Sequence, residues 1–200
     1  MSEPAARPVP VLAASRVRLR PPAPADAAEA RRIGLHPEVL LGYGIELEEW
    51  RELTAAEVAE FLASLAPAAD KVEWVVEVDG AFIGTARLHS FDAPCRSAAY
   101  AVGLAAPEHL GHGLGTEVTR LVSAYAFGGL GLTALTVRVL DDNRRAISCY
   151  TRCGFVLDHR EPRALQLDGE WRHDVIMHLD AARYRVLTAS WTSGGDYPEL

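Results

Sequence analysis

The stretch with the clearest chemical potential is PEHLGHGLGTEVTRL, residues 107 to 121, in which three glycines precede apolar residues at helical spacing. The N-terminus of a helix presents unpaired backbone N–H groups and a partial positive charge, so it attracts anions. Glycines lack the Cβ atoms that would keep an anion at a distance. Gly111, Gly113 and Gly115 therefore predict a phosphate-binding turn, although a plain glycine-rich connection between a strand and a helix also fits these residues alone.

Two common nucleotide-binding motifs do not fit this turn. A P-loop requires a lysine after its last glycine, and the single lysine of the chain, Lys71, lies elsewhere. The dinucleotide fingerprint requires glycine or alanine where Thr116 stands. ATP and NAD are therefore poor candidates for the phosphate ligand.

A second pattern, NRRAISCYTRCGF, follows at residues 143 to 155. Together with HLGHGLGTE it resembles the GCN5-related N-acetyltransferases, the GNAT superfamily. In that family a (Q/R)xxGxG/A turn precedes one helix, and an NxxAxxxYxxxGF segment lies on the next. The segments RVRLRPPAPADAAEA and LDGEWRHDVIMHL resemble the start and the end of its ribosomal-protein N-terminal acetyltransferase branch, which is RimJ/RimL-like. The resemblance therefore covers about residues 15 to 180.

The resemblance implies an α/β fold with a mixed, mostly antiparallel central sheet, in which two parallel strands splay apart between flanking helices. Acetyl-coenzyme A would lie where those strands part, with its pyrophosphate on the glycine turn. Tyr150 would donate a proton to the departing thiolate, because an unperturbed phenol with a pKa near 10 stays protonated at neutral pH. The cofactor-binding residues implied are Leu104, His109, Leu110, Gly111, His112, Gly113, Leu114, Gly115, Thr116 and Asn143.

The chain departs from the family pattern at two places. Leu110 replaces the leading Gln or Arg, so the backbone amides of residues 111 to 116 must bind the pyrophosphate, with help from His109 or His112. The strand expected from Ser97 to Ala105 holds no acid, whereas the branch carries a glutamate there. The general base is therefore open between a water relay and four side chains, which are His89, Asp92, Glu77 and Glu108.

Several of these residues also have a structural interpretation. Tyr150 lies at a spacing typical of the buried face of a helix, and Asn143 is a typical helix N-cap. Cys149 and Cys153 lie four residues apart on the same expected helix, and no Cys-His signature surrounds them. We expect both to be reduced packing residues.

The pair of histidines in the glycine turn and an acidic segment also have interpretations without a functional role. His109 and His112 lack further ligands at suitable spacing, so we expect no metal site. An acidic segment surrounds Trp50 between the first two expected helices, which wall the acceptor site in the family. It could attract a protonated amine or form a solvated face; its acids are Glu46, Glu48, Glu49 and Glu52.

The composition excludes some classes of function. A net charge of −7 lacks the positive footprint of a nucleic-acid-binding protein and suits a cationic substrate better. The longest uncharged run, from Arg120 to Arg138, is broken by glycines and does not predict a membrane span. Three cysteines and a polar, proline-rich start without a secretory segment predict the cytoplasm, and the arginine-rich, lysine-poor usage suggests a bacterial genome.

The pattern of elements predicts a single acetyltransferase domain over residues 15 to 182. Residues 1 to 14 are expected to form a flexible leader, and residues 183 to 200 a C-terminal extension that could pack against a second subunit in a homodimer. Asp26 is expected to cap a helix, and Thr54 with Glu57 predicts a capping box. Hairpin turns are predicted at Asp79-Gly80 and Asp168-Gly169.

The sequence thus predicts an N-acetyltransferase that transfers an acetyl group from acetyl-coenzyme A to a primary amine. The acceptor is a protein N-terminus or a small molecule, and neither a nucleic acid nor a membrane is an expected partner. The alternative is a non-catalytic module of the same fold that senses acetyl-coenzyme A, which the missing acid and Leu110 would permit.

Overall fold

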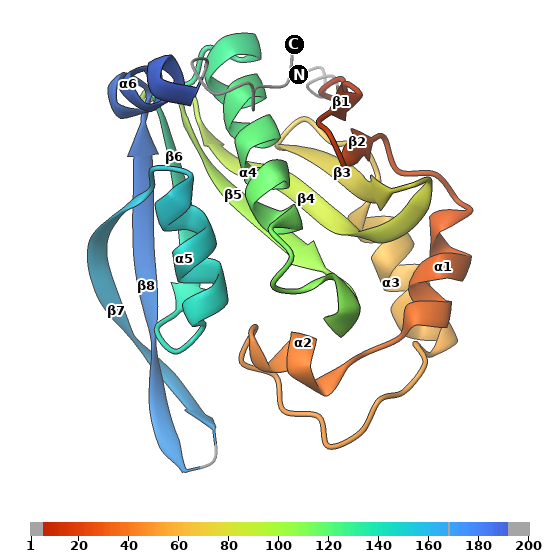
Figure 1. The fold of residues 1–200 in the computed structure, drawn as a ribbon. Coiled ribbons are helices and arrows are strands. Elements are labelled where there is room, and N and C mark those ends of the chain that lie inside the picture. The colour runs from red at the N-terminus through yellow and green to blue at the C-terminus, as the bar shows by residue number, and fades with distance from the viewer. Residues whose placement is uncertain (1–5, 168, 192–200) are drawn as a thin grey trace, which may run out of the picture.

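The computed structural model describes residues 6–167 and 169–191, which build a sheet of eight strands in the order β1-β2-β3-β4-β5-β6-β8-β7 (Figure 1). Within this part of the chain every neighbouring pair is antiparallel except β5 and β6, which run parallel. The strands are β1 (Leu12–Ala13), β2 (Arg18–Arg20), β3 (Lys71–Val78), β4 (Ala81–Asp92), β5 (Ser97–Leu104), β6 (Ala134–Leu140), β7 (Val156–Leu167) and β8 (Glu170–Asp180).

The helices divide into two groups on the sheet. Helix α1 packs on α3 and β4, whereas α4 packs on β5 and α5; Figure 1 shows α4 and α5 side by side across the two halves of the sheet. A 3₁₀ turn (Pro107–His109) precedes α4, and a π-helical segment (Tyr125–Gly129) follows it. The helices are α1 (Asp26–Ile33), α2 (Pro37–Leu41), α3 (Ala55–Ser64), α4 (Leu114–Ala124), α5 (Arg144–Arg152) and α6 (Ala181–Trp191).

Strand β3 separates two hydrophobic clusters because successive side chains of a strand point to opposite faces. Trp74 and Val76 belong to the large cluster under α4, whereas Val75 belongs to a smaller cluster with Ile33 and Phe82. Both faces of the sheet are therefore covered, and β3 reads as an almost continuously buried run.

The parallel strands β5 and β6 pair over three residues only. Their register joins Ser97 to Ala134, Ala98 to Leu135 and Ala99 to Thr136. Beyond this point β5 continues to Leu104 and β6 to Leu140 without pairing to each other. The expected mixed sheet with two splayed parallel strands and flanking helices is confirmed.

The packed domain extends beyond the expected limits of residues 15 and 182. On the N-terminal side Leu12 is buried in the main cluster, and the Trp74 indole donates a hydrogen bond to the Pro10 carbonyl at 2.8 Å. On the C-terminal side, Tyr184 of α6 is buried with its ring centroid 4.7 Å from that of Phe127. Residues from the described parts of the expected leader and extension therefore take part in the core. On the N-terminal side, a two-residue strand gives too little sequence pattern to reveal this.

Local capping follows the sequence in one case and differs in another. Thr54 and Glu57 form the expected capping box at the start of α3. Asp26 is not the N-cap of α1, because that position belongs to Ala25. Its carboxylate instead accepts hydrogen bonds from the Ala23 backbone at 2.6 Å and from the Arg20 guanidinium. Asp79 and Gly80 form the expected turn, both with positive φ, whereas Asp168 lies outside the described residues.

Two buried carboxylates on β3 differ in how they are paired. Glu77 accepts a hydrogen bond from Arg20 at 2.6 Å and a weaker one from Arg18 at 3.3 Å. Glu73 lies opposite Arg87 in the sheet, yet its Oε2 atom has no hydrogen-bond donor among the described residues. Burial raises the pKa of Glu73 to about 7, and the positive charges of Arg87 and Lys71 offset this effect only in part.

The raised pKa of Glu73 makes stability depend on pH. The folded protein binds this proton more tightly than the unfolded chain does. The contribution of Glu73 to the free energy of unfolding is therefore most favourable below pH 4.5, and it decreases as the pH rises to about 7. We expect Glu73→Gln to stabilise the protein at pH 8 by up to about 3 kcal/mol, at 1.36 kcal/mol per pKa unit, and by less than a third of that at pH 5. Chemical denaturation at both pH values measures the difference.

The matched control is Glu77→Gln, because Glu77 lies on the same strand as Glu73 but forms an ion pair with Arg20 of β2. This control should destabilise the protein at pH 8, because the half-buried Arg20 guanidinium then loses one of its two carboxylate partners and keeps only Asp26. Equal stabilisation by Glu73→Gln at both pH values would contradict the conclusion that burial raises the pKa of the Glu73 carboxyl.

Candidate active site

The glycine turn has the backbone geometry that its sequence predicted. Gly111 and Gly113 have φ angles of 79° and 82°, in the left-handed region that favours glycine. Gly113 is the N-cap of α4, so the first free N–H groups of that helix follow it directly. No side chain of the described residues caps this end of the helix. The Thr116 and Glu117 amides donate to the Gly113 carbonyl, which leaves the preceding amides of Leu114 and Gly115 to an anion.

An arginine from the other end of the chain holds the turn. Arg16 donates from Nε to the Glu117 carboxylate at 2.5 Å and from Nη1 to the His112 carbonyl at 3.0 Å. A Cβ added to Gly113 would lie 3.3 Å from Nη2 of the same arginine. Sequence analysis missed Arg16 because this contact joins segments about a hundred residues apart and no local spacing signals it.

A cleft of about 410 Å³ opens beside the turn, between the end of β5, the start of α5 and the loop after α2. Every cofactor-binding residue expected from the sequence lines this cleft except His112, whose backbone carbonyl is held by Arg16. The lining residues are Val39, Gly42, Tyr43, Val102, Leu104, His109, Leu110, Gly111, Gly113, Leu114, Gly115, Thr116, Asn143, Arg144, Arg145, Ala146, Ser148, Cys149, Tyr150 and Arg152.

Asn143 has both of the roles that its position allows. Its side-chain oxygen accepts a hydrogen bond from the Ala146 backbone at 3.1 Å, which caps α5. Its side-chain nitrogen donates to the Gly42 carbonyl at 3.1 Å. Asn143 therefore fixes the loop after α2 against α5, across the mouth of the cleft.

Three arginines on α5 line the cleft, although the sequence analysis did not select them. Arg144 and Arg145 lie in its first turn and Arg152 in its last. Arg145 forms an ion pair with Glu38 of α2 at 2.5 Å. The arginines bring positive charge to a cleft in which Leu110 offers none, and the sequence signal was the pair of arginines directly after Asn143.

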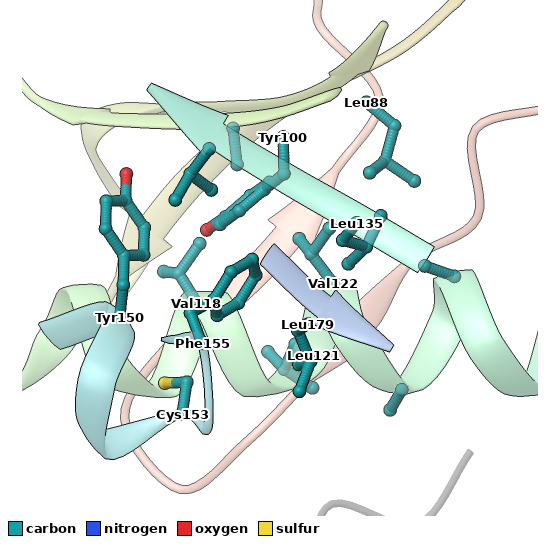
Figure 2. Close-up of a cluster of buried hydrophobic side chains, with 14 of the residues drawn as sticks. Leu88, Tyr100, Val118, Leu121, Val122, Leu135, Tyr150, Cys153, Phe155 and Leu179 are labelled. Carbon is teal, nitrogen blue, oxygen red and sulfur yellow. The ribbon is translucent and has the colours of Figure 1, made fainter. Parts of the chain in front are cut away.

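Tyr150 lines the cleft and is 5% exposed. Figure 2 shows its ring beside Tyr100 and Phe155, with ring centroids 6.2 Å and 5.6 Å away. Burial raises the pKa of Tyr150 further above its usual value, so the phenol keeps its proton at neutral pH. Sequence analysis left open whether Tyr150 packs in the core or lines the cofactor site, and the structure shows that it does both.

Tyr100 occupies the position on β5 at which the resemblance would place an acid. Its hydroxyl lies 3.1 Å from the Thr119 hydroxyl, which itself donates to the Gly115 carbonyl at 2.7 Å. The single Thr119 proton is thus committed, and Tyr100 donates to it. Because burial also raises its pKa well above the usual value, Tyr100 cannot take a proton from an amine.

None of the four candidate bases lines the cleft, as far as the described residues extend. Glu77 is paired with Arg20, and Asp92 accepts a hydrogen bond from the Cys95 backbone at 3.2 Å. His89 contacts the Ser90 hydroxyl, and Glu108 is exposed on the 3₁₀ turn. Of the alternatives left open by the sequence, a relay through water is the one that does not require any of these four side chains to line the cleft.

Cys149 is a free cysteine on the wall of the cleft. Its Sγ atom lies 3.6 Å from the Thr116 hydroxyl and 3.8 Å from the Thr119 hydroxyl. A hydrogen bond from the Cys153 thiol, together with these hydroxyls, lowers the pKa of Cys149. Cys149 thus forms no disulfide with a described residue, and its thiol is more acidic than an ordinary cysteine thiol.

A second cavity of about 240 Å³ lies behind the first and shares Val39, Tyr43 and Leu104 with it. Sequence analysis missed Tyr43, whose hydroxyl lies 3.4 Å from the Val102 carbonyl. Over the described part of the chain, no three His, Cys, Asp or Glu side chains gather in a way that could hold a metal ion. No described helix is long and apolar enough to span a membrane.

Comparison with curated proteins finds an acetyltransferase as a relative. Spermidine N(1)-acetyltransferase from Escherichia coli is 29% identical over 111 residues, which are 56% of this chain and 59% of that protein. The chain thus matches less than two thirds of the length of this relative. Two solved structures share the fold at low identity. Spermidine N-acetyltransferase from Vibrio cholerae, in complex with CoA and spermine, has a TM-score of 0.71 at 21% identity, over 85% of this chain and 98% of that one.

The second solved structure is RimJ from Mycobacterium smegmatis in complex with CoA-disulfide. It has a TM-score of 0.68 at 22% identity, over 90% of this chain and 95% of that one. The family model of the acetyltransferase (GNAT) domain matches residues 16–156, well over half of the chain. With the splayed parallel strands and the glycine turn in place, the chain belongs to the GNAT acetyltransferase family.

Proposed function

We propose that the protein is an acetyl-coenzyme A-dependent N-acetyltransferase that acts on a primary amine. The observation that carries the proposal is the cleft between β5 and α5, whose lining combines the N-terminal end of α4, three arginines of α5 and the Tyr150 residue. An anionic group and a reacting sulfur can therefore be held in one site. Relatives that include both spermidine acetyltransferases and RimJ support the reaction class but do not choose between acceptors.

The cleft fits the cofactor on its own geometry. The amides that follow Gly113 suit the pyrophosphate, and the side chains of Arg144 and Arg152 supply the opposite charge. The edge of β5 at Val102 and Leu104 is free of β6, so its backbone groups can pair with the amides of the pantetheine arm. When bound, acetyl-coenzyme A supplies an acetyl thioester.

The residues around the reacting centre have separate tasks. Tyr150 holds a proton at its hydroxyl and can deliver it to the leaving sulfur. The aromatic neighbours Tyr100 and Phe155 fix the direction of that ring. Water in the cleft takes the proton of the amine, since no carboxylate lines the described cleft.

Cys149 reports directly on whether the cofactor occupies this cleft. We expect saturating acetyl-coenzyme A to slow alkylation of Cys149 by iodoacetamide at least tenfold at pH 7.5, because the bound cofactor covers the wall that holds the thiol. Peptide mass spectrometry after timed quenching measures the rate. Exposed Cys95 is the internal control, and its rate should not change. Equal protection of both cysteines, or of neither, would place the cofactor elsewhere.

The glycine turn is tested by a pair of glycines with the same backbone strain. Gly113→Val should raise the dissociation constant for coenzyme A at least 100-fold, because its side chain would enter the anion site and press on Arg16. Gly131→Val is the control, since Gly131 also has a positive φ of 63° but lies in open space. Isothermal titration of both variants separates loss of binding from backbone strain, and similar affinities would refute the turn as the phosphate site.

The proton donor is tested by removing single hydroxyls. Tyr150→Phe should lower kcat by about 100-fold and leave the KM for acetyl-coenzyme A nearly unchanged, within the 10²–10⁴-fold typical of general acids. Tyr100→Phe removes a neighbouring buried hydroxyl that faces Thr119 and should change kcat by less than threefold. Thiol release measures both. Undiminished turnover in Tyr150→Phe would exclude this role, and binding without any turnover in the unaltered protein would favour the sensor alternative.

A further inference from the structure

We propose that the acceptor is a primary amine carried on a compact apolar body, which occupies the second cavity while its nitrogen points into the cleft. This inference rests on the proposed function, because it identifies the acceptor class of the same site. It goes beyond the spermidine and the spermine that are named for two of the similar proteins.

The second cavity has the right place for an acceptor. It shares the lining residues Val39, Tyr43 and Leu104 with the cleft, so a molecule in it lies next to the cofactor site. Its volume of about 240 Å³ is below the ~300–1,000 Å³ of pockets that hold drug-sized ligands. The cavity therefore fits a body the size of one large side chain.

The walls of the cavity are apolar. Phe61 of α3 and Phe82 of β4 meet edge to face with ring centroids 6.2 Å apart, and Ala30 of α1 closes the base. Among the described lining residues none is an Asp, Glu, Lys or Arg. The full lining is Ala30, Gly34, Leu35, His36, Val39, Leu40, Tyr43, Leu53, Phe61, Phe82, Gly84, Thr85, Gly103, Leu104 and Ala105.

This lining is unsuited to a polyamine. A polyamine with one nitrogen at the thioester would pass its chain along these walls, where no described lining residue is a carboxylate that could pair with a second ammonium group, and an unpaired charge against apolar walls is costly. An aromatic or branched aliphatic body instead gains from burial, at about 25 cal/mol per Å² of apolar surface. The lining therefore selects against a second charge as well as for apolar surface.

The acidic residues near the cavity are already paired or face solvent. Glu57 forms an ion pair with Arg51 at 2.6 Å, and Glu38 forms one with Arg145. The acids of the segment around Trp50 are exposed and none lines either cavity; Glu52 additionally lies 3.5 Å from Arg31. Of the two interpretations of this segment, the geometry thus favours a solvated face over a site that attracts a protonated amine.

Tyr43 lines both cavities. Its hydroxyl reaches the backbone of β5, and a Cβ on Gly103 would lie only 2.3 Å from that oxygen. Gly103 is therefore required for Tyr43 to stand where it does. The phenol oxygen keeps lone pairs that can accept a hydrogen bond from the nitrogen of the acceptor as it enters the cleft.

A panel of amines tests the acceptor class with the unmodified protein and saturating acetyl-coenzyme A. Phenethylamine and isoamylamine represent the apolar class, whereas spermidine and putrescine represent polycations. We expect kcat/KM for phenethylamine, measured by thiol release, to exceed that for spermidine at least 100-fold. An amidated peptide with N-terminal phenylalanine, compared with one that begins with glycine, shows whether the apolar body can belong to a polypeptide.

The outcomes separate this inference from the proposed function. Acetylation of spermidine at an equal or higher kcat/KM would overturn the apolar acceptor and leave the acetyltransferase intact. Cofactor binding without thiol release for any amine or peptide would overturn both. Acetylation of the phenylalanine peptide but not of phenethylamine would assign the same pocket chemistry to a polypeptide N-terminus and support the inference.

Two variants of the pocket give an independent readout. Leu35→Glu should lower kcat/KM for phenethylamine at least tenfold and raise that for putrescine, because Leu35 lines the cavity and a carboxylate there can pair with a second ammonium. Leu62→Glu, at an exposed site on α3 outside the lining, is the matched control and should change neither.

Phe61→Leu provides a milder change should Leu35→Glu fold poorly. It enlarges the apolar pocket without adding charge, so KM for phenethylamine should rise about tenfold while the dissociation constant for coenzyme A stays constant. An unchanged KM for phenethylamine in both Leu35→Glu and Phe61→Leu would show that the acceptor binds elsewhere.

Discussion

The structure depends on the parting of two parallel strands inside a continuous sheet. After three paired residues, β5 and β6 separate, and their backbone N–H and C=O groups near Val102 and Leu104 no longer face each other. Such groups need hydrogen-bond partners, and a strand edge inside a protein is normally paired or covered. The split therefore creates a site in which a ligand with amides of its own completes the sheet. Helices α4 and α5 each follow one of the two strands, so both begin beside the opening.

The opening has different chemistry on its two sides. The cleft side carries helix amides and arginines, although the whole chain has a net charge of −7. The side behind β5 is formed by α1, α2 and α3 and is apolar. A local field matters more than net charge for a site of this size, because exposed charges more than about 10 Å away are screened at ordinary salt. The net charge of the chain therefore did not predict the apolar lining of the second cavity.

The sequence predicted what depends on local spacing. Gly113, Asn143 and Tyr150 were identified because a turn, a helix cap and a helix face have fixed spacings along the chain, and the sheet and its splay followed from the family resemblance. Arg16 and Tyr43 were missed because their contacts at the site join residues 96 and 59 positions apart, and no periodicity encodes such distances. The second cavity was missed for the same reason, since its walls come from three helices and two strands together with their loops.

The arginines at the start of α5 show how the site takes precedence over the stability of the helix. The first turn of a helix favours negative charge, yet α5 has no acid there and instead begins with Arg144 and Arg145. This placement costs a helix typically 0.3–1 kcal/mol for each charge at an exposed site. Glu38 offsets one of the two charges by its ion pair with Arg145. A phosphate bound in the cleft would offset the other, so the unfavourable charge in the free protein becomes a favourable contact in the complex, and it supplies the charge that Leu110 does not.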